Sequence, residues 1–158
     1  MAWRVVGCGA HAFEAEAHAV EALITLDTSA ILALLDRREV HHSSAVATLE
    51  ADPGPYLVPA GILAEVGFMV ETRLGTSVLD LFLADLENGA FTLDCGDQDL
   101  ARIRQLVRDY ADLPLGTADA SVIACAERSG GRVLTFDVRD FGVVARESAI
   151  TVLPPAGP

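Results

Sequence analysis

The sequence predicts an α/β protein, a three-layer α/β/α sandwich around a short, mostly parallel sheet of five strands. Three observations predict this class. Short apolar runs alternate along the chain with longer stretches whose apolar residues recur at helical spacing. Glycine, proline and asparagine separate the two kinds of segment. Acidic residues recur directly after the apolar runs, where the carboxyl ends of parallel strands would lie.

Length and composition set the domain organisation. At 158 residues, 51% of them hydrophobic, the chain can fold as one domain without disulfides. We expect that domain over residues 22–153 and a frayed tail over 154–158. Residues 1–21 carry no strong pattern, so they are either a flexible N-terminal extension or the product of a start codon placed too far upstream. Three widely spaced cysteines indicate thiols in a reducing, cytoplasmic compartment. No apolar run is long enough to predict a membrane span.

The charge of the chain excludes several kinds of phosphate chemistry. The net charge is -12, and all eleven basic residues are arginine. Without lysine the chain cannot carry a Walker-A phosphate loop, and receiver-type phospho-aspartate domains also normally use a lysine. So acidic a chain is an unpromising general binder of nucleic acid, and it suits a basic protein partner.

The first half of the domain predicts three strands and four helices, each bounded by a local signal. Thr28 and Ser29 can cap a helix, Pro59 can begin one, and Gly75 separates two helices. The expected elements, in order, are a strand over 22–26, helices from 28 to about 38 and over 41–52, a strand over 56–58, helices from 59 and over 76–87, and a strand over 91–93.

The second half predicts helix and strand in alternation. Asp97 is expected to cap a helix that runs to about Tyr110, and Thr117 to cap the next one. Gly130 and Gly131 would end that helix. The remaining elements expected are a buried strand over 132–136, a loop that carries acids, a short helix or turn over 143–147 and an edge strand over 150–153.

Four acids lie at or just after expected strand ends, or in the first turns of the helices that follow. These are Asp27, Glu65, Asp119 and Asp137. Asp27 could simply be a helix cap, and Glu65 could pair with Arg73. Because parallel strands end at one edge of a sheet, all four are instead expected to meet there. Oxygen ligands without histidine or cysteine suit Mg²⁺ or Mn²⁺, and such ions promote attack of water on a phosphodiester.

In four segments the chain resembles the PIN-domain ribonucleases, most closely the VapC-type toxins of bacterial toxin–antitoxin pairs. The resemblance covers roughly residues 22–153 and rests on Leu-Asp-Thr-Ser-Ala-Ile-Leu-Ala-Leu (26–34), Glu65, Asp-Leu-Pro-Leu-Gly-Thr-Ala-Asp-Ala-Ser-Val-Ile-Ala (112–124) and Val-Leu-Thr-Phe-Asp-Val-Arg-Asp-Phe (133–141). It implies a Mg²⁺-dependent endoribonuclease that cuts RNA and is usually a homodimer. It also implies a cognate VapB-type antitoxin that holds the enzyme inactive.

The resemblance also implies roles for individual residues. The metal-binding acids of the family would be Asp27, Glu65, Asp119 and Asp137. Other side chains would support the acids or contact RNA, namely Ser29, Thr135, Asp140 and, less directly, Asp112 as supports, and Arg37, Arg73 and Arg139 at the RNA. His41 and His42 are interpreted as surface residues. Two alternatives stay open, a non-catalytic PIN-like module that binds protein or RNA, and a DNA or structure-specific nuclease.

Overall fold

The computed structural model describes residues 23–52, 54–113 and 115–155. Within these residues the strands are β1 (Ile24–Leu26), β2 (Tyr56–Pro59), β3 (Thr92–Asp94), β4 (Arg132–Leu134) and β5 (Thr151–Leu153). The helices are α1 (Thr28–Leu35), α2 (His42–Ala51), α3 (Ala60–Leu74), α4 (Thr76–Glu87), α5 (Leu100–Asp109), α6 (Thr117–Arg128) and α7 (Val138–Glu147). The extension predicted over residues 1–21 lies outside the described residues.

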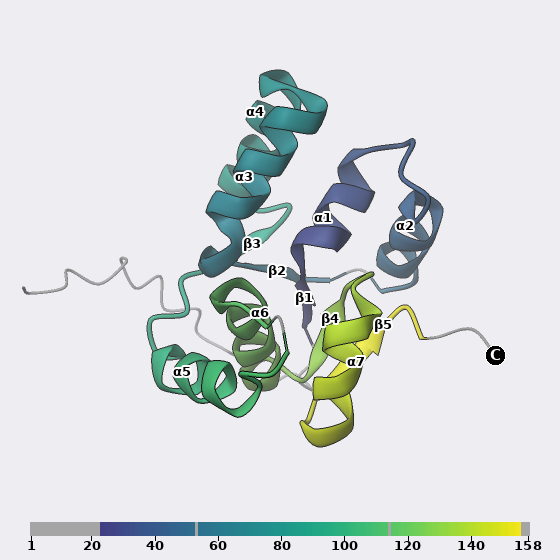
Figure 1. The fold of residues 1–158 in the computed structure, drawn as a ribbon. Helices are drawn as coiled ribbons and strands as arrows, with labels where there is room; N and C mark the ends of the chain where they lie inside the picture. The colour runs from purple at the N-terminus through teal and green to yellow at the C-terminus, as the bar shows by residue number, and fades with distance from the viewer. Residues whose placement is uncertain (1–22, 53, 114, 156–158) are drawn as a thin grey trace, which may run out of the picture.

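The strands form one parallel sheet in the order β3-β2-β1-β4-β5. The predicted fold class is therefore confirmed. The chain first builds the sheet outward from β1 to β3, then crosses back to β4 on the other side of β1 (Figure 1). In such sheets ligands bind outside the carboxyl ends of the strands where the direction reverses. Here that point lies between β1 and β4, which are paired through Leu26 and Leu134.

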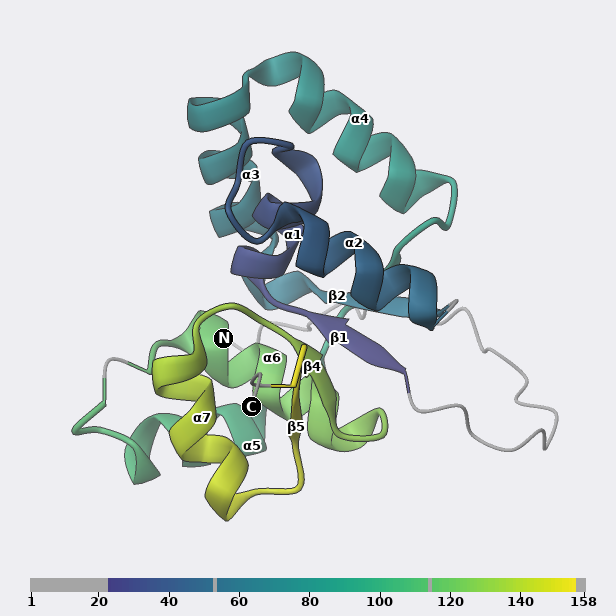
Figure 2. The ribbon, with the colours of Figure 1, turned by 90° about the vertical axis from the view of Figure 1, so that its right-hand side faces the viewer.

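The two helical layers follow from this topology. Helices α1 to α4 cover one face of the sheet and α5 to α7 cover the other, in both of two perpendicular views (Figures 1 and 2). All three residues of the central strand β1 are buried, as expected for a strand between two helical layers. Helix α6 is buried without a break from Ala120 to Ala126, because it packs on the sheet and also contacts α3 and α5. In the described part of the chain no helix combines the length and apolarity that a membrane crossing requires.

The largest difference from the predicted elements is α7. A loop was expected from Asp137 and a short helix only from residue 143, but the helix begins at Val138. Phe141 and Val144 are fully buried, three residues apart, and this apolar pair anchors the helix on the sheet. The preceding strand stops at Leu134 instead of 136, so Thr135, Phe136 and Asp137 form a short connection.

Three predicted helix caps were wrong. Asp27, not Thr28 or Ser29, caps α1 by accepting a hydrogen bond from the Ser29 N–H. Gly116, not Thr117, occupies the N-cap position of α6.

The third cap, Asp97, was predicted for α5, but that helix begins at Leu100 with Asp99 at its N-cap position. Asp99 does not cap the helix through its side chain, because its carboxylate accepts hydrogen bonds from Arg128 of α6 instead. A tertiary ion pair has thus replaced the local cap.

Candidate functional site

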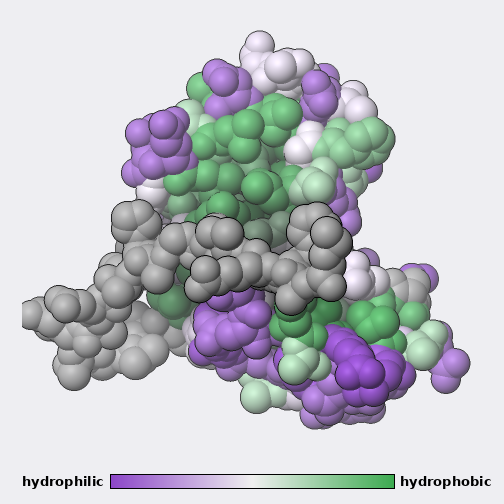
Figure 3. Space-filling view, turned by 90° about the vertical axis from the view of Figure 1, so that its left-hand side faces the viewer, coloured by the Kyte–Doolittle hydropathy of each residue, from purple (hydrophilic) through white to green (hydrophobic). Residues whose placement is uncertain are grey.

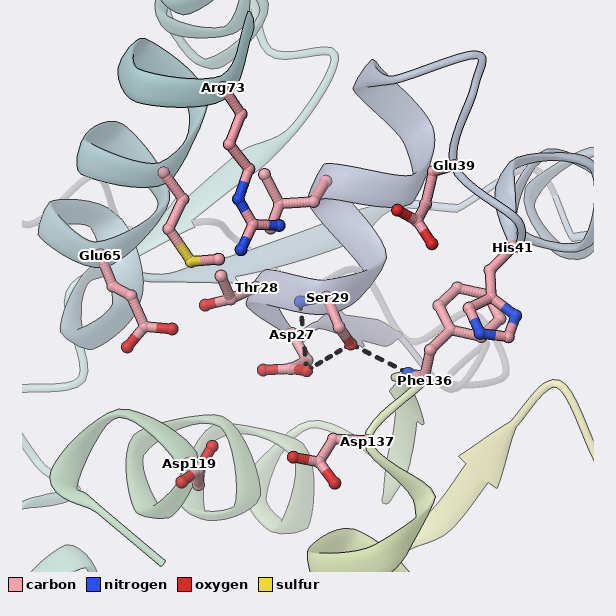
Figure 4. Close-up of a pocket in the computed structure, with 12 residues that line it drawn as sticks. Asp27, Thr28, Ser29, Glu39, His41, Glu65, Arg73, Asp119, Phe136 and Asp137 are labelled. Carbon is pink, nitrogen blue, oxygen red and sulfur yellow. Dashed lines mark hydrogen bonds between the residues drawn. The ribbon is translucent and has the colours of Figure 1, made fainter.

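A pocket of about 270 Å³ lies at the carboxyl edge of β1 and β4, at the point where the sheet reverses direction (Figure 4). Four predicted acids line it from four different elements. The lining residues are Asp27, Thr28, Ser29, Leu32, Glu39, His41, Glu65, Met69, Arg73, Asp119, Phe136 and Asp137. The structure therefore brings Asp27, Glu65, Asp119 and Asp137 to one pocket, although each comes from a different part of the chain.

Asp27 is held rigidly at the base of this pocket. It is 5% exposed, and its Oδ2 atom accepts three hydrogen bonds. The donors are Ser29 N at 3.3 Å, Ser29 Oγ at 2.7 Å and Thr135 Oγ1 at 2.9 Å. Its other oxygen, Oδ1, accepts none from the described residues. Asp27 is thus a helix cap through one oxygen and keeps the other available to the pocket.

Ser29 and Thr135 join the two strand ends to each other. Besides binding Asp27, Ser29 Oγ accepts a hydrogen bond from Phe136 N at 2.9 Å. Thr135 Oγ1 accepts one from Asp137 N at 3.0 Å. The two hydroxyls are 3.3 Å apart, so they form one continuous network. This network fixes the backbone that carries Asp137 relative to Asp27.

Asp119 lies in the first turn of α6, where a carboxylate is favoured by the helix dipole. Its Oδ2 accepts a hydrogen bond from Gly116 N at 3.1 Å. Burial, together with the negative charges of Asp27, Glu65 and Asp137, raises the pKa of Asp119 to about 6, despite that hydrogen bond. Burial first, and the neighbouring carboxylates in addition, therefore oppose ionisation of Asp119 in this pocket.

Glu65 and Asp137 complete the set from α3 and from the N-cap position of α7. Both are exposed, and neither carboxylate accepts a hydrogen bond from any described residue. Arg73, the alternative partner considered for Glu65, forms no ion pair with it; both side chains extend from α3 toward the pocket (Figure 4). These two acids are therefore free to change rotamer.

The pocket offers carboxylate oxygens, which are the ligands that a hard divalent cation prefers. In this structure, however, these oxygens do not lie close together around one point. Among residues 23–52, 54–113 and 115–155, no three Asp, Glu, His or Cys side chains lie close enough to hold an ion as they stand. Thr28 adds a second sign of an incomplete polar site. Its Oγ1 is buried beside Asp27 without a hydrogen-bond partner in the described structure, which is unusual for a buried hydroxyl.

The other predicted residues divide into those near the pocket and those outside it. Of the three arginines predicted at the RNA, only Arg73 lines the pocket. Arg139 is 77% exposed and pairs with Asp140 at 3.1 Å. Asp140 is buried but does not line the pocket. Arg37 and Asp112 are exposed and are not among the lining residues either.

Two aromatic residues of the pocket were missed from the sequence. His41 stacks on Phe136 with a centroid distance of 4.4 Å and an interplanar angle of 8° (Figure 4). His42, expected at the surface, is partly buried and its Nδ1 lies 2.7 Å from the carbonyl oxygen of Ala33. The adjacent histidines therefore have different roles, one tying α2 to α1 and the other lining the pocket. The signal available in the sequence was that the two histidines are adjacent, because adjacent residues of a helix point in different directions.

Comparison with known proteins gives matches over most of the chain. The family model for the PIN domain matches residues 24–147. Ribonuclease VapC26 of Mycobacterium tuberculosis is 31% identical over 121 residues, covering 75% of this chain and 90% of that protein.

Three solved structures are similar in fold at lower identity. VapC20 of Mycobacterium tuberculosis, described as a sarcin-ricin loop cleaving toxin, has a TM-score of 0.66 at 19% identity and covers 76% of this chain and 94% of its own. VapBC2 from Rickettsia felis, bound to a DNA fragment from their promoter, has a TM-score of 0.59 at 14% identity and covers 82% and 96%. FitAcB from Neisseria gonorrhoeae has a TM-score of 0.55 at 21% identity and covers 82% and 96%.

Proposed function

This chain belongs to the PIN domain family and is related to the VapC ribonucleases, and from that premise we propose that it is a metal-dependent endoribonuclease acting as the toxin of a type II toxin–antitoxin pair. One observation carries the proposal. Asp27, Glu65, Asp119 and Asp137 come from four separate elements and line one pocket at the reversal point of a parallel sheet.

The proposed cofactor is Mg²⁺, with Mn²⁺ as a substitute. The donor set supports this choice because it consists of carboxylate and hydroxyl oxygens, which hard cations prefer. The ligands would be Oδ1 of Asp27 and the carboxylates of Glu65, Asp119 and Asp137, of which Glu65 and Asp137 can turn inward. A bound ion would polarise the phosphate and stabilise the departing oxygen. It would also offset the repulsion from neighbouring carboxylates, which adds to the effect of burial on the pKa of Asp119.

The proposed reaction is hydrolysis of an RNA phosphodiester. A water oxygen forms a bond to phosphorus and gives up a proton, one bridging P–O bond breaks, and the departing oxygen takes up a proton, which leaves a phosphomonoester and an alcohol. Ser29 and Thr135 keep Asp27 in one orientation throughout, since both donate to its Oδ2. Arg73 is the basic side chain of the lining set, and we assign it to the RNA phosphate.

The proposed protein partner is a cognate antitoxin of the VapB type, acting in the cytoplasm on a toxin that is itself a homodimer. The VapBC2 structure from Rickettsia felis, whose name joins VapB with VapC, supports such a partner. So does the surface of this chain. Apolar side chains gather on the face formed by α3 and α4 (Figure 3). Phe68, Leu81 and Leu83 of these helices are 69%, 64% and 45% exposed, as expected of residues that a protein partner covers.

The test is cleavage of a broad RNA pool by purified protein with Mg²⁺, Mn²⁺ or EDTA. We expect cutting with either metal and none with EDTA. Asp27→Asn and Asp119→Asn should each lower the rate at least about 100-fold, because each removes a charge on which cation binding depends. Both variants should stay folded, since an asparagine oxygen can still accept the hydrogen bonds that these residues receive at helix starts.

The matched control is Asp80→Asn, which removes an exposed acid from α4, away from the pocket. It should cut RNA at the wild-type rate. Retained cleavage by both site variants would refute the assignment of the acids. Folded wild-type protein that binds RNA without cutting it in either metal would instead favour the alternative, a PIN-like binding module.

A further inference from the structure

The stacked pair His41 and Phe136 lies at the pocket but has no part in holding the acids through its side chains. His41 occupies the N-cap position of α2, and Phe136 lies in the connection between β4 and α7. Both rings line the same pocket as Asp27 and Asp137. Their planes are within 8° of parallel at a centroid distance of 4.4 Å, so together they form a flat two-ring platform (Figure 4).

The position of this platform is fixed relative to the acids. Phe136 N donates to Ser29 Oγ at 2.9 Å, and Ser29 Oγ donates to Asp27 Oδ2 at 2.7 Å. Phe136 is also the immediate neighbour of Asp137. Any planar group that binds on the platform would therefore be held at a set distance from the two acids at the ends of β1 and β4.

The platform is exposed to solvent at His41, whose ring is stacked on one face only among the described aromatic residues. The His41 side chain is exposed, forms no hydrogen bond with a described residue and does not cap α2. Phe136 covers one face of its ring, and no other aromatic ring in the described structure stacks on the second face. His42, by contrast, is used internally through its contact with Ala33. An exposed aromatic ring at a pocket, supported from behind, is how proteins present a stacking surface to single-stranded nucleic acid.

The charge of the pocket favours recognition of RNA by stacking over attraction to its phosphates. Five carboxylates line the pocket, those of Asp27, Glu39, Glu65, Asp119 and Asp137, against one arginine, Arg73. A polyanion gains little from Coulomb attraction at such a site, even with a cation bound. Stacking on a base does not depend on phosphate charge, and unpaired RNA bases are commonly bound between or on aromatic rings.

We propose that the open face of His41 binds an unpaired nucleobase of the RNA by stacking, with Phe136 supporting the ring, next to the phosphodiester that is cut. This inference rests on the proposed ribonuclease function and adds a binding position for the substrate base. The platform selects single-stranded or looped RNA, because a base within a duplex cannot expose its face to the ring.

The test measures binding and cleavage separately, using the full chain. For binding, every protein carries Asp119→Asn, and the probe is a short unpaired RNA oligonucleotide series in which each position in turn carries 2-aminopurine. Stacking on His41 should quench the fluorescence of 2-aminopurine at one position of the series. His41→Ala should abolish that quenching and weaken affinity about fivefold to a hundredfold, whereas His41→Phe, which keeps an aromatic face, should retain both.

For cleavage, the same changes are made in the otherwise wild-type chain. His41→Ala should raise KM with little change in kcat, because the ring binds substrate and touches no reacting atom. Val40→Ala is the matched control, since Val40 is the neighbouring residue, is 82% exposed and does not line the pocket. It should leave KM unchanged. Thermal unfolding of each variant monitors the fold, and a structural role alone would lower the unfolding temperature without this split between KM and kcat.

Wild-type affinity and KM in folded His41→Ala would overturn the proposal while leaving the ribonuclease assignment intact. Equal losses of quenching and RNA affinity in His41→Ala and His41→Phe would also overturn it. The imidazole nitrogens, and not the ring face, would then be responsible for RNA binding. A folded wild-type chain that neither cuts nor binds RNA would overturn both this inference and the proposed function.

Discussion

Gly61 of α3 lies directly against Ser121 of α6, with no room between them for a side chain. A Cβ atom on Gly61 would collide with Ser121 Oγ and would lie 2.6 Å from Ser121 Cβ. The contact is close in sequence to the pocket acid that each helix carries. Glu65 follows Gly61 by about one helical turn, and Asp119 precedes Ser121 by two residues. The distance between the two helices at this point therefore sets the distance between the backbone positions of Glu65 and Asp119.

Gly61→Ala should push α3 away from α6 and lower the cleavage rate about 10- to 100-fold, because a small misplacement of a catalytic group costs that much. The overpacking should also cost about 1–3 kcal/mol of unfolding free energy. Adding Ser121→Gly removes both colliding atoms and should restore cleavage. The control is Gly67→Ala in the same helix, where a new Cβ would meet only Leu79 Cδ1 at 4.0 Å. Wild-type cleavage and stability in Gly61→Ala would show that this contact does not set the spacing.

Ser29→Ala should lower both stability and cleavage, since it removes the hydroxyl that connects Asp27 to the backbone of Phe136. Leaving the partly buried Phe136 N–H without its acceptor should cost about 1–3 kcal/mol, measured by urea unfolding. Loss of the donor to Asp27 should lower kcat more than it raises KM. Ser44→Ala on α2 is the control and should change neither quantity. Unchanged kcat in Ser29→Ala would exclude an orienting role for this hydroxyl.

The raised pKa of Asp119 predicts how stability depends on pH when no metal is present. The folded protein binds this proton with a pKa of about 6, whereas the unfolded chain binds it near about 3.9. Between these values the folded state carries more protons, so the free energy of unfolding falls as pH rises through this window. Asp119→Asn should remove that contribution. At pH 7.5 in EDTA the free energy of unfolding of this variant should exceed that of wild type by on the order of 1 kcal/mol. Partial solvent exposure of Asp119 reduces the expected difference to this value.

Urea unfolding of both proteins across pH 4 to 7.5 checks this prediction, with the exposed Asp97→Asn as control. The stability difference between Asp119→Asn and wild type should grow with pH and should be smallest at the acidic end. Parallel pH profiles for the two proteins would mean that Asp119 ionises in the folded state as easily as in the unfolded chain.

Arg128 is predicted to stabilise the end of α6 far from the pocket. Its guanidinium donates to Asp99 at 3.0 and 2.9 Å and to Asp94 at 2.7 Å. These acids raise the pKa of Arg128 further, so the guanidinium stays charged. Asp99 is 6% exposed, and Arg128→Gln would leave it without its charged partner. We expect a loss of about 1–3 kcal/mol in thermal or urea unfolding.

Arg104→Gln on α5 is the control for this change, because Arg104 is exposed and forms no ion pair with a described residue. The free energy of unfolding of Arg104→Gln should lie within about 0.5 kcal/mol of that of wild type. Equal stability of the two variants would mean that the Arg128 ion pairs contribute nothing net, as is common for pairs at the surface.

Elements with strong local signals were predicted closely. The helix expected over 76–87 is α4 with the same bounds, because Gly75 and Asn88 mark its ends. The start of α7 was missed because its first turn holds Arg139 and Asp140, which resemble a loop. Burial of Phe141 against the sheet decides that segment, and burial is a tertiary property that local sequence does not show.

The candidate site was predictable to the extent that sheet topology determines it. Acids after parallel strands share one edge, and for that reason Asp27 and Asp137 could be placed together from sequence. The direction of long exposed side chains is not determined this way. Of the arginines expected to contact RNA, Arg73 lines the pocket, whereas Arg37 and Arg139 do not, and their contact with RNA stays a prediction. The stack of His41 on Phe136 depends on the path of the turn after α1, which no periodic pattern specifies.

The position of β4 next to β1 also determines when the pocket can first exist during synthesis. β1 is the first strand to be translated. Its neighbour β4 and the acid after it, Asp137, are among the last parts of the domain to leave the ribosome. A nascent chain that stops before Arg132 lacks one of the two strands that pair with β1, and it lacks the Thr135 hydroxyl that donates to Asp27. The complete pocket therefore cannot form until the domain is nearly finished.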